Sequence, residues 1–148
     1  MEIDGLPLHP LVVHAAVVFT PLACLAALLY LVPGLRDRLR WPLLVLALLS
    51  VGLIWLAYIA GEDLREDRFA TATGAFAEQL DEHEDLAGTL RWVVSGFGLV
   101  AVLAAWLHSR AGVVRVLLMV LLAAGAIATL VYVYLTGDAG SRAVYPPQ

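Results

Sequence analysis

Residues 41–61 read WPLLVLALLSVGLIWLAYIAG, an apolar stretch without a single charged side chain, and this stretch decides the fold class. About 20 such residues form a helix that is long enough to cross the hydrocarbon core of a bilayer. Three more apolar stretches of similar length occupy residues 11–31, 86–107 and 113–135. The sequence therefore predicts an all-α integral membrane protein, an up-and-down four-helix bundle that forms one domain over residues 1–148.

The composition supports this prediction. Apolar residues make up 61% of the 148 residues and charged residues only 15%, with a mean hydropathy of +0.86. The nine basic residues are all arginine and stand against 13 acidic ones, which gives a net charge of −4. Such a chain has no basic surface for a run of phosphates, so nucleic-acid binding is excluded as the main function. Cys24 is the only cysteine, so no disulfide can form within the chain.

The arginines are distributed unevenly between the two sides of the predicted bundle. The short loops after the first and third stretches contain five arginines, and the other side contains three. In membrane proteins the cytoplasmic loops carry the excess of basic residues. We therefore expect a protein of the plasma membrane with both termini and the 62–85 segment outside. The five arginines are Arg36, Arg38, Arg40, Arg110 and Arg115.

The 62–85 segment is acidic and has a helical pattern. It holds nine carboxylates and two arginines, a net charge of −7. Phe69, Thr73, Phe76 and Leu80 recur at steps of three and four residues. This pattern predicts an amphipathic helix over 69–85 that lies along the outer surface and runs into the third span. A solvated acidic loop is the alternative.

With this topology, the outer end of the bundle collects most of the unusual polar residues. They are His9, His14, Glu62, Asp63, His83, Arg91 and Asp138. His14 lies inside an apolar stretch, about 6 Å beyond a helix start at Pro10, so its ring needs a partner. His83 shares a helical stripe with Ala87 and Leu90, which we take as the bundle-facing side. We expect His14 and His83 to face each other. The structural alternative for His14 is a histidine bonded to a backbone carbonyl. The alternative for His9 is a role at the start of the helix.

Arg91 lies about 7.5 Å into the third span, counted from Leu86. An ionisable residue at such a depth is a candidate for a functional site. Its expected partners are the acidic residues of the outer end or the carboxylates of a cofactor. Snorkelling of the side chain to the headgroups is the structural alternative.

Two cofactor hypotheses follow from these residues. Haem b needs two nitrogen donors on opposite sides of an apolar slot, which antiparallel helices can supply. His14 and His83 are then the expected axial ligands, and Arg91 and Arg142 would pair with the propionates. The rival is a zinc, copper or iron ion held by His9, His14 and His83 together with Glu62 or Asp138.

Three motifs give the chain a resemblance to a known family. They are HPLVVH at residues 9–14, AGED at residues 60–63 and TGDAGSRAVY at residues 136–145. With them the chain resembles, over residues 6–145, the bacterial four-helix membrane proteins known as the domain of unknown function 2231 family. Members occur fused to Rieske-type iron–sulfur domains, so the resemblance implies a bacterial inner-membrane protein linked to electron transfer. Members often carry Gly-His-x-Gly after the last helix, where this chain has Asp138 in place of the histidine.

The second class of function is an interaction or assembly protein whose histidines are structural and whose acidic outer segment steers a basic partner. In either class the expected partners are the lipid bilayer and an electron-transfer or other membrane protein. The sequence is also compatible with a homo-oligomer. A transporter is less favoured because no span carries a mid-membrane acid or a broken helix. No internal repeat is evident from the residue identities. The sequence leaves open whether the protein is an enzyme.

Overall fold

The computed structural model describes residues 1–3 and 5–144. This part of the chain folds into four long helices, which are α1 (Leu8–Tyr30), α2 (Arg36–Phe69), α3 (Ala75–Trp106) and α4 (Val113–Val144). A short antiparallel hairpin of β1 (Glu2–Ile3) and β2 (Leu6–Pro7) precedes them. The all-α fold class is confirmed, and among the described residues four helices are long and apolar enough to cross a membrane.

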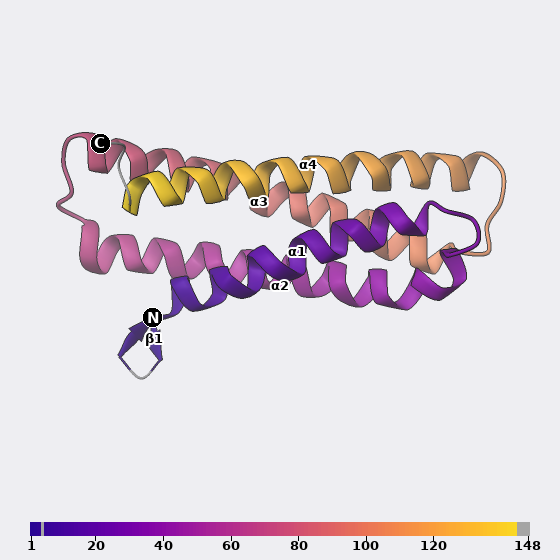
Figure 1. Cartoon of the computed structure of the whole chain (residues 1–148), viewed down its shortest axis with the longest axis horizontal. Coiled ribbons are helices and arrows are strands. Elements are labelled where there is room, and N and C mark those ends of the chain that lie inside the picture. Colours follow the sequence, from indigo (N-terminus) through magenta and orange to yellow (C-terminus); the bar gives the residue numbers. More distant parts are fainter. Residues whose placement is uncertain (4, 145–148) are drawn as a thin grey trace.

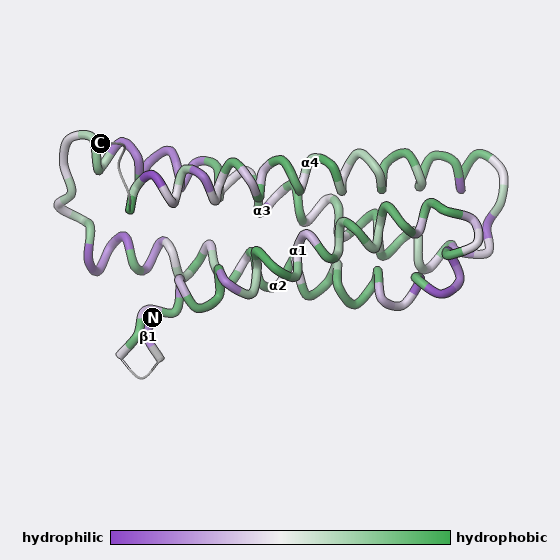
Figure 2. The backbone as a smooth tube through the Cα atoms, viewed as in Figure 1, coloured by the Kyte–Doolittle hydropathy of each residue, from purple (hydrophilic) through white to green (hydrophobic). Residues whose placement is uncertain are grey.

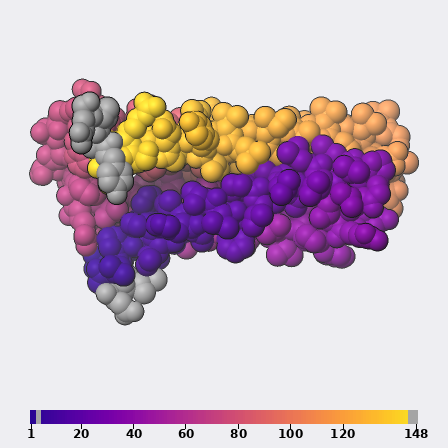
Figure 3. Space-filling view, in the orientation of Figure 1, coloured from indigo at the N-terminus to yellow at the C-terminus, as the bar shows by residue number. Residues whose placement is uncertain are grey.

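The helices run up and down in chain order and form a bundle (Figure 1). α1 packs on α2 and α3 packs on α4, while contacts of α2 with α3 and of α1 with α4 join the two hairpins. Figure 3 shows α1 and α4 side by side across one face. α1 and α3 therefore lie diagonally opposite each other. We call the end with the α2–α3 connection the histidine end, after His9 and His83, and the opposite end the arginine end, after Arg36 and Arg115.

The core of the bundle is built mainly from small residues. An added Cβ at Gly98 of α3 would lie only 2.6 Å from Cγ2 of Val51 on α2, so a larger residue there would force the Val51 side chain or the helices to shift. Small residues let helix backbones approach closely, as is common between membrane helices. Six alanines are completely buried, and four large side chains fill the remaining space: Ala23, Ala27, Ala47, Ala101, Ala104 and Ala126, with Tyr30, Leu43, Phe97 and Leu122.

The outward surface along the middle of the bundle is apolar. Figure 2 shows hydrophobic colouring along the middle of the helices and hydrophilic colouring near both ends. Because apolar residues point both inward and outward, the pattern of hydropathy does not indicate which face of a helix is buried. The large apolar side chains exposed along the middle include Leu22, Leu25, Val45, Leu99, Val120 and Ile127.

α2 and α3 continue beyond their apolar stretches and form a helical tip over residues 62–85 (Figure 1). The expected helix over 69–85 is not a separate element. Residues 62–69 are the last turns of α2, residues 75–85 are the first turns of α3, and the chain reverses between them at Gly74, which has a φ of 68°. Two contacts hold the tip together: Arg65 Nη2 donates to Asp81 Oδ1 at 2.7 Å, and the ring centroids of Phe69 and Phe76 lie 5.6 Å apart.

Candidate functional site

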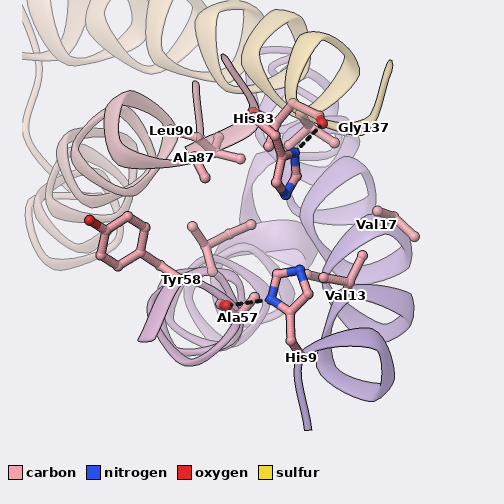
Figure 4. A pocket seen from close by; sticks show the side chains of 13 residues that line it. His9, Val13, Val17, Ala57, Tyr58, His83, Ala87, Leu90 and Gly137 are labelled. Atoms are coloured by element: carbon pink, nitrogen blue, oxygen red, sulfur yellow. Dashed lines mark hydrogen bonds between the residues drawn. The ribbon is translucent and has the colours of Figure 1, made fainter. Parts of the chain in front are cut away.

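His9 and His83 meet at the histidine end, from the diagonal helices α1 and α3 (Figure 4). Nδ1 of His9, in the first turn of α1, lies 2.7 Å from the carbonyl oxygen of Ala57 on α2. Nδ1 of His83 lies 2.9 Å from the carbonyl oxygen of Thr136 on α4. The two ring centroids are 6.1 Å apart, and the ring planes are nearly perpendicular at 85°. Each histidine thus ties its own helix to the next helix of the chain and presents its ring to the other histidine.

These hydrogen bonds define which nitrogen of each ring is free. A carbonyl oxygen can only accept, so Nδ1 of each ring carries a hydrogen and donates it. In a neutral ring, Nε2 then keeps its lone pair, and Figure 4 shows Nε2 of each ring on the side of the other ring. Metal-binding histidines commonly donate their second N–H to a backbone carbonyl in this way.

The surroundings of His83 favour the neutral ring. His83 precedes the apolar stretch that begins at residue 86. Burial lowers the pKa of His83 below its ordinary value, the bond to Thr136 acts in the opposite direction, and the nearby His9 lowers the pKa further. On the tip beside it, burial raises the pKa of the Glu84 carboxyl, against the influence of Arg65. The neutral form of His83 is the form that can act as a metal ligand.

Each ring rests on a glycine of the neighbouring helix. An added Cβ at Gly61 on α2 would lie 3.0 Å from Nδ1 of His9, and one at Gly140 on α4 would lie 3.0 Å from Nδ1 of His83. Each glycine follows, one helical turn later, the residue whose carbonyl accepts the histidine N–H. The two glycines therefore leave the space that the rings occupy.

The two hairpins repeat this arrangement. His9, Ala57 and Gly61 of the first hairpin correspond to His83, Thr136 and Gly140 of the second. The chain therefore contains an internal structural repeat, which the sequence analysis did not detect because the similarity is limited to positions that contact neighbouring helices. The same correspondence relates buried positions of α2 and α4: Leu43 to Leu122, Ala47 to Ala126, Ser50 to Thr129 and Ala60 to Ala139.

A cavity of about 70 Å³ adjoins the two histidines. This volume has room for a few water molecules, or for an ion with water ligands. Thr136 lines the cavity, and its hydroxyl is buried without a hydrogen-bond partner in the described part of the chain. The other walls are mostly apolar and follow the repeat, with Val13, Ala16, Ile54 and Tyr58 from the first hairpin and Ala87, Leu90, Val133 and Gly137 from the second.

Arg91 lies beside this cavity but does not line it. Its guanidinium carbon is 3.9 Å from the ring centroid of Tyr58, 5.2 Å from that of Trp55 and 5.6 Å from that of Trp92. These aromatic faces attract the cation. Because Tyr58 also lines the cavity, Arg91 is connected to the site through the Tyr58 ring.

His14 does not join the site. It is exposed on α1, and its Nδ1 bonds to the carbonyl of Pro10, one turn back in the same helix. The expectation that His14 faces His83 is wrong, because the buried stripe of α1 runs through Val12, Ala16 and Thr20. That stripe turns His9 inward and His14 outward.

The other residues expected at the site have different partners. Glu62 accepts a hydrogen bond from the Tyr58 hydroxyl at 2.7 Å, Asp63 pairs with the N-terminal amine, and Asp138 pairs with Arg142 at 2.6 Å. Within residues 1–3 and 5–144, no group of three or more His, Cys, Asp or Glu side chains is placed to hold a metal ion. The set of His9, His14, His83, Glu62 and Asp138 is therefore not brought together, and only His9 and His83 of that set line the cavity.

A second polar cluster lies at the arginine end. The buried Tyr30 hydroxyl donates to the carbonyl of Ala104 at 3.0 Å and lies 2.8 Å from Nδ1 of His108. Nε2 of His108 in turn donates to Asp37 at 2.6 Å. Sequence reasoning missed this cluster because its members come from three separate segments.

Sequence reasoning also missed Tyr58, Thr136 and the two glycines. One signal was available, because Ala60-Gly61 and Ala139-Gly140 occupy equivalent places near the ends of α2 and α4. Comparisons of the chain with protein-family models, curated proteins and solved structures gave no match. The resemblance to the domain of unknown function 2231 family therefore stays a prediction.

Proposed function

We propose that this chain is an integral membrane protein that binds a transition metal between His9 and His83. The membrane part is supported by the length of the four helices and by their apolar outward surface, which a soluble protein would not expose to water. Exposed aromatic side chains lie near both ends of the apolar region, where membrane proteins place them. They are Trp41 and Trp106 towards the arginine end, and Trp92 and Tyr134 towards the histidine end.

The pair of facing imidazoles is the observation that carries the metal site. A metal–nitrogen distance of about 2.0 Å and a ring radius of roughly 1.1 Å place two imidazoles that bind one ion from opposite sides with centroids about 6 Å apart. The separation in this protein is 6.1 Å. Both rings also have the carbonyl partner at Nδ1 that a metal-binding histidine usually has.

The size of the cavity favours a single ion. A volume of about 70 Å³ accepts an ion with a few waters, whereas the plane of haem b would require α2 and α4 to move apart. Copper or iron suits a site with imidazole ligands, while a structural zinc site takes four ligands from the protein. Haem b is the second candidate, because two opposed imidazoles are also an axial ligand pair. In that case Arg91, stacked on Tyr58, would be available to a propionate, whereas Arg142 is paired with Asp138.

We propose a redox role for the bound metal. Copper and iron exchange single electrons, and neutral ligands in an apolar cavity favour the lower oxidation state. Trp55 and Trp92 pack edge to face at 5.4 Å around Arg91, next to Tyr58, so easily oxidised rings adjoin the site. The acidic helical tip at the same end would steer a basic electron-transfer partner towards it.

We further propose that the histidine end faces the outside of a bacterial plasma membrane. The α1–α2 and α3–α4 connections, with the adjoining helix turns, hold five arginines and a single carboxylate, Asp37, whereas the tip is acidic. Short loops with an excess of arginine stay in the cytoplasm. The metal would then be accessible to extracytoplasmic partners.

The test is the metal content and visible spectrum of protein purified in detergent after expression with copper, iron and haem precursor supplied. His9→Asn and His83→Asn are the informative variants, because asparagine can donate to the same carbonyl but has no atom in the place of Nε2. We expect the parent to purify with close to one metal per chain and each variant to lose most of it. His14→Asn is the matched control and should retain the parent's content. A Soret band would assign haem, and a parent that binds neither metal nor haem would overturn the proposal.

An interaction or assembly protein is the second candidate class. It is favoured by the fact that the Nδ1 bonds of His9 and His83 already tie α1 to α2 and α3 to α4, which gives both histidines a structural use. In that case no variant binds metal, and the asparagine variants unfold at the temperature of the parent because they keep the hydrogen bond. The acidic tip would then be the surface to test for a partner.

A further inference from the structure

The arginine end contains a cleft that the proposed function does not use. It has a volume of about 590 Å³ and lies between the α1–α2 and α3–α4 connections. Leu31 and Met119 form part of its apolar wall. The polar side chains that line it are Arg36, Asp37, His108, Ser109 and Arg115. The cleft therefore combines cationic groups with an apolar wall.

The lining holds two arginines and one carboxylate, so the positive charge of this cleft is only partly compensated. Neither Arg36 nor Arg115 forms an ion pair within residues 1–3 and 5–144. Arg36 stacks on the ring of Tyr30 at 5.2 Å, and its Nε is buried without a hydrogen-bond partner in the same part of the chain. The one carboxylate of the lining, Asp37, is 92% exposed and already bonded to His108. Two guanidinium groups are thus free to bind an anion.

We propose that this cleft binds the phosphate group of an anionic phospholipid. Guanidinium groups bind phosphate oxygens through paired, charge-assisted hydrogen bonds, and the Ser109 hydroxyl supplies a further donor. Basic pockets between membrane helices on the cytoplasmic side are typical sites for anionic headgroups. The apolar wall at Leu31 and Met119 favours the phosphate of a lipid, which carries acyl chains, over free phosphate. The inference shares with the proposed function the placement in a membrane and the orientation with the arginine end in the cytoplasm, but not the metal site.

The experiment is native mass spectrometry of detergent-purified protein titrated with phosphatidylglycerol, and with phosphatidylcholine as the lipid without net charge. The test variant is Arg36→Gln with Arg115→Gln. The control is Arg38→Gln with Arg110→Gln, which removes the same charge from the same end but from two exposed arginines that do not line the cleft. We expect phosphatidylglycerol to bind the test variant about tenfold or more weakly than the parent, because each lost bond to a charged group costs a factor of about ten. The control should bind like the parent.

Three outcomes decide the source of the ligand and the fate of the proposal. If inorganic phosphate displaces the lipid, the cleft is a phosphate site whose ligand is a soluble phosphate. Equal binding of both lipids by the parent, or an equal loss in the control variant, would overturn the proposal. If the double variant fails to fold by circular dichroism, Arg115→Gln alone gives the same test at an exposed position. If the protein binds the lipid but no metal, the proposed metal site is refuted and the proposal for this cleft stands.

Discussion

Gly61 and Gly140 determine where the two imidazole rings can lie. At both positions an added Cβ would lie 3.0 Å from ring atoms, which is closer than such atoms approach without a shift. The backbone around the glycines is helical, so it offers no means of moving the Cβ away. The ring itself would have to shift by a few tenths of an ångström, which strains its bond to Ala57 or Thr136.

Replacing Gly140 by alanine tests this directly. We expect Gly140→Ala to cost about 1–3 kcal/mol of stability through overpacking, and to weaken metal binding about tenfold or more because the ligand loses its orientation. Gly96→Ala is the matched control, since an added Cβ there meets nothing within 4 Å and alanine favours the helix. Thermal unfolding in detergent and a metal titration measure both effects. Equal stability of the two variants would show that the glycine does not position His83.

The choice between His9 and His14 shows what the sequence could not settle. A span that is apolar on all sides has no hydropathy difference between its lipid face and its core face, so the helical phase of α1 was not readable from hydropathy. The small residues were the better guide, because Ala16, Ala23 and Ala27 mark the buried stripe. Two helical turns before Ala16, the same stripe includes His9. His14 lies on a different face of the helix. His83 was placed correctly on the bundle side because its stripe includes Ala87 and Leu90.

The helical tip is held by contacts between two elements that the sequence did not pair. Arg65 of α2 lies 2.7 Å from Asp81 and 3.6 Å from Glu84 of α3, and its side chain is only 23% exposed. Phe69 and Phe76 close the end of the tip. That each apolar stretch lies in a long helix was predicted from its length and hydropathy. The extension of α2 to Phe69 was not predicted, because it depends on contacts across the hairpin rather than on hydropathy.

Loss of the Arg65 contacts should loosen the tip without unfolding the bundle. We expect Arg65→Gln to cost about 0.5–1 kcal/mol locally, as for a partly exposed ion pair, and to speed amide exchange over residues 75–85 several-fold. Arg68→Gln is the control, because Arg68 pairs with Glu2 of the N-terminal hairpin instead. Hydrogen exchange followed by mass spectrometry distinguishes the two. Fast exchange throughout 75–85 in the parent itself would mean that this segment is a disordered loop.

On the scale of the whole molecule, charge is separated between the two ends. The tip carries nine carboxylates and two arginines, and the opposite connections with their adjoining turns carry five arginines and one carboxylate. The internal repeat brings one histidine from each hairpin to the acidic end. The proposed metal site and the proposed phosphate cleft thus lie at opposite ends of the bundle. The orientation of a membrane-embedded bundle would decide which compartment each one meets.

Cysteine labelling in intact cells tests the orientation. In a Cys24→Ala background, Ala75→Cys at the tip should react with a membrane-impermeant thiol reagent, because the positive connections are retained in the cytoplasm. Arg38→Cys should react only after the cells are opened. The reverse pattern would place the histidine end in the cytoplasm.

X-ray absorption spectroscopy at the edge of the bound metal tests most directly whether one metal binds both His9 and His83. The spectrum counts the imidazole ligands and gives their distance from the metal. We expect two imidazoles at about 2.0 Å in the parent and in His14→Asn, and one in His9→Asn or His83→Asn loaded with excess metal. A parent spectrum without imidazole scattering, or two imidazoles still bound in His9→Asn, would contradict it.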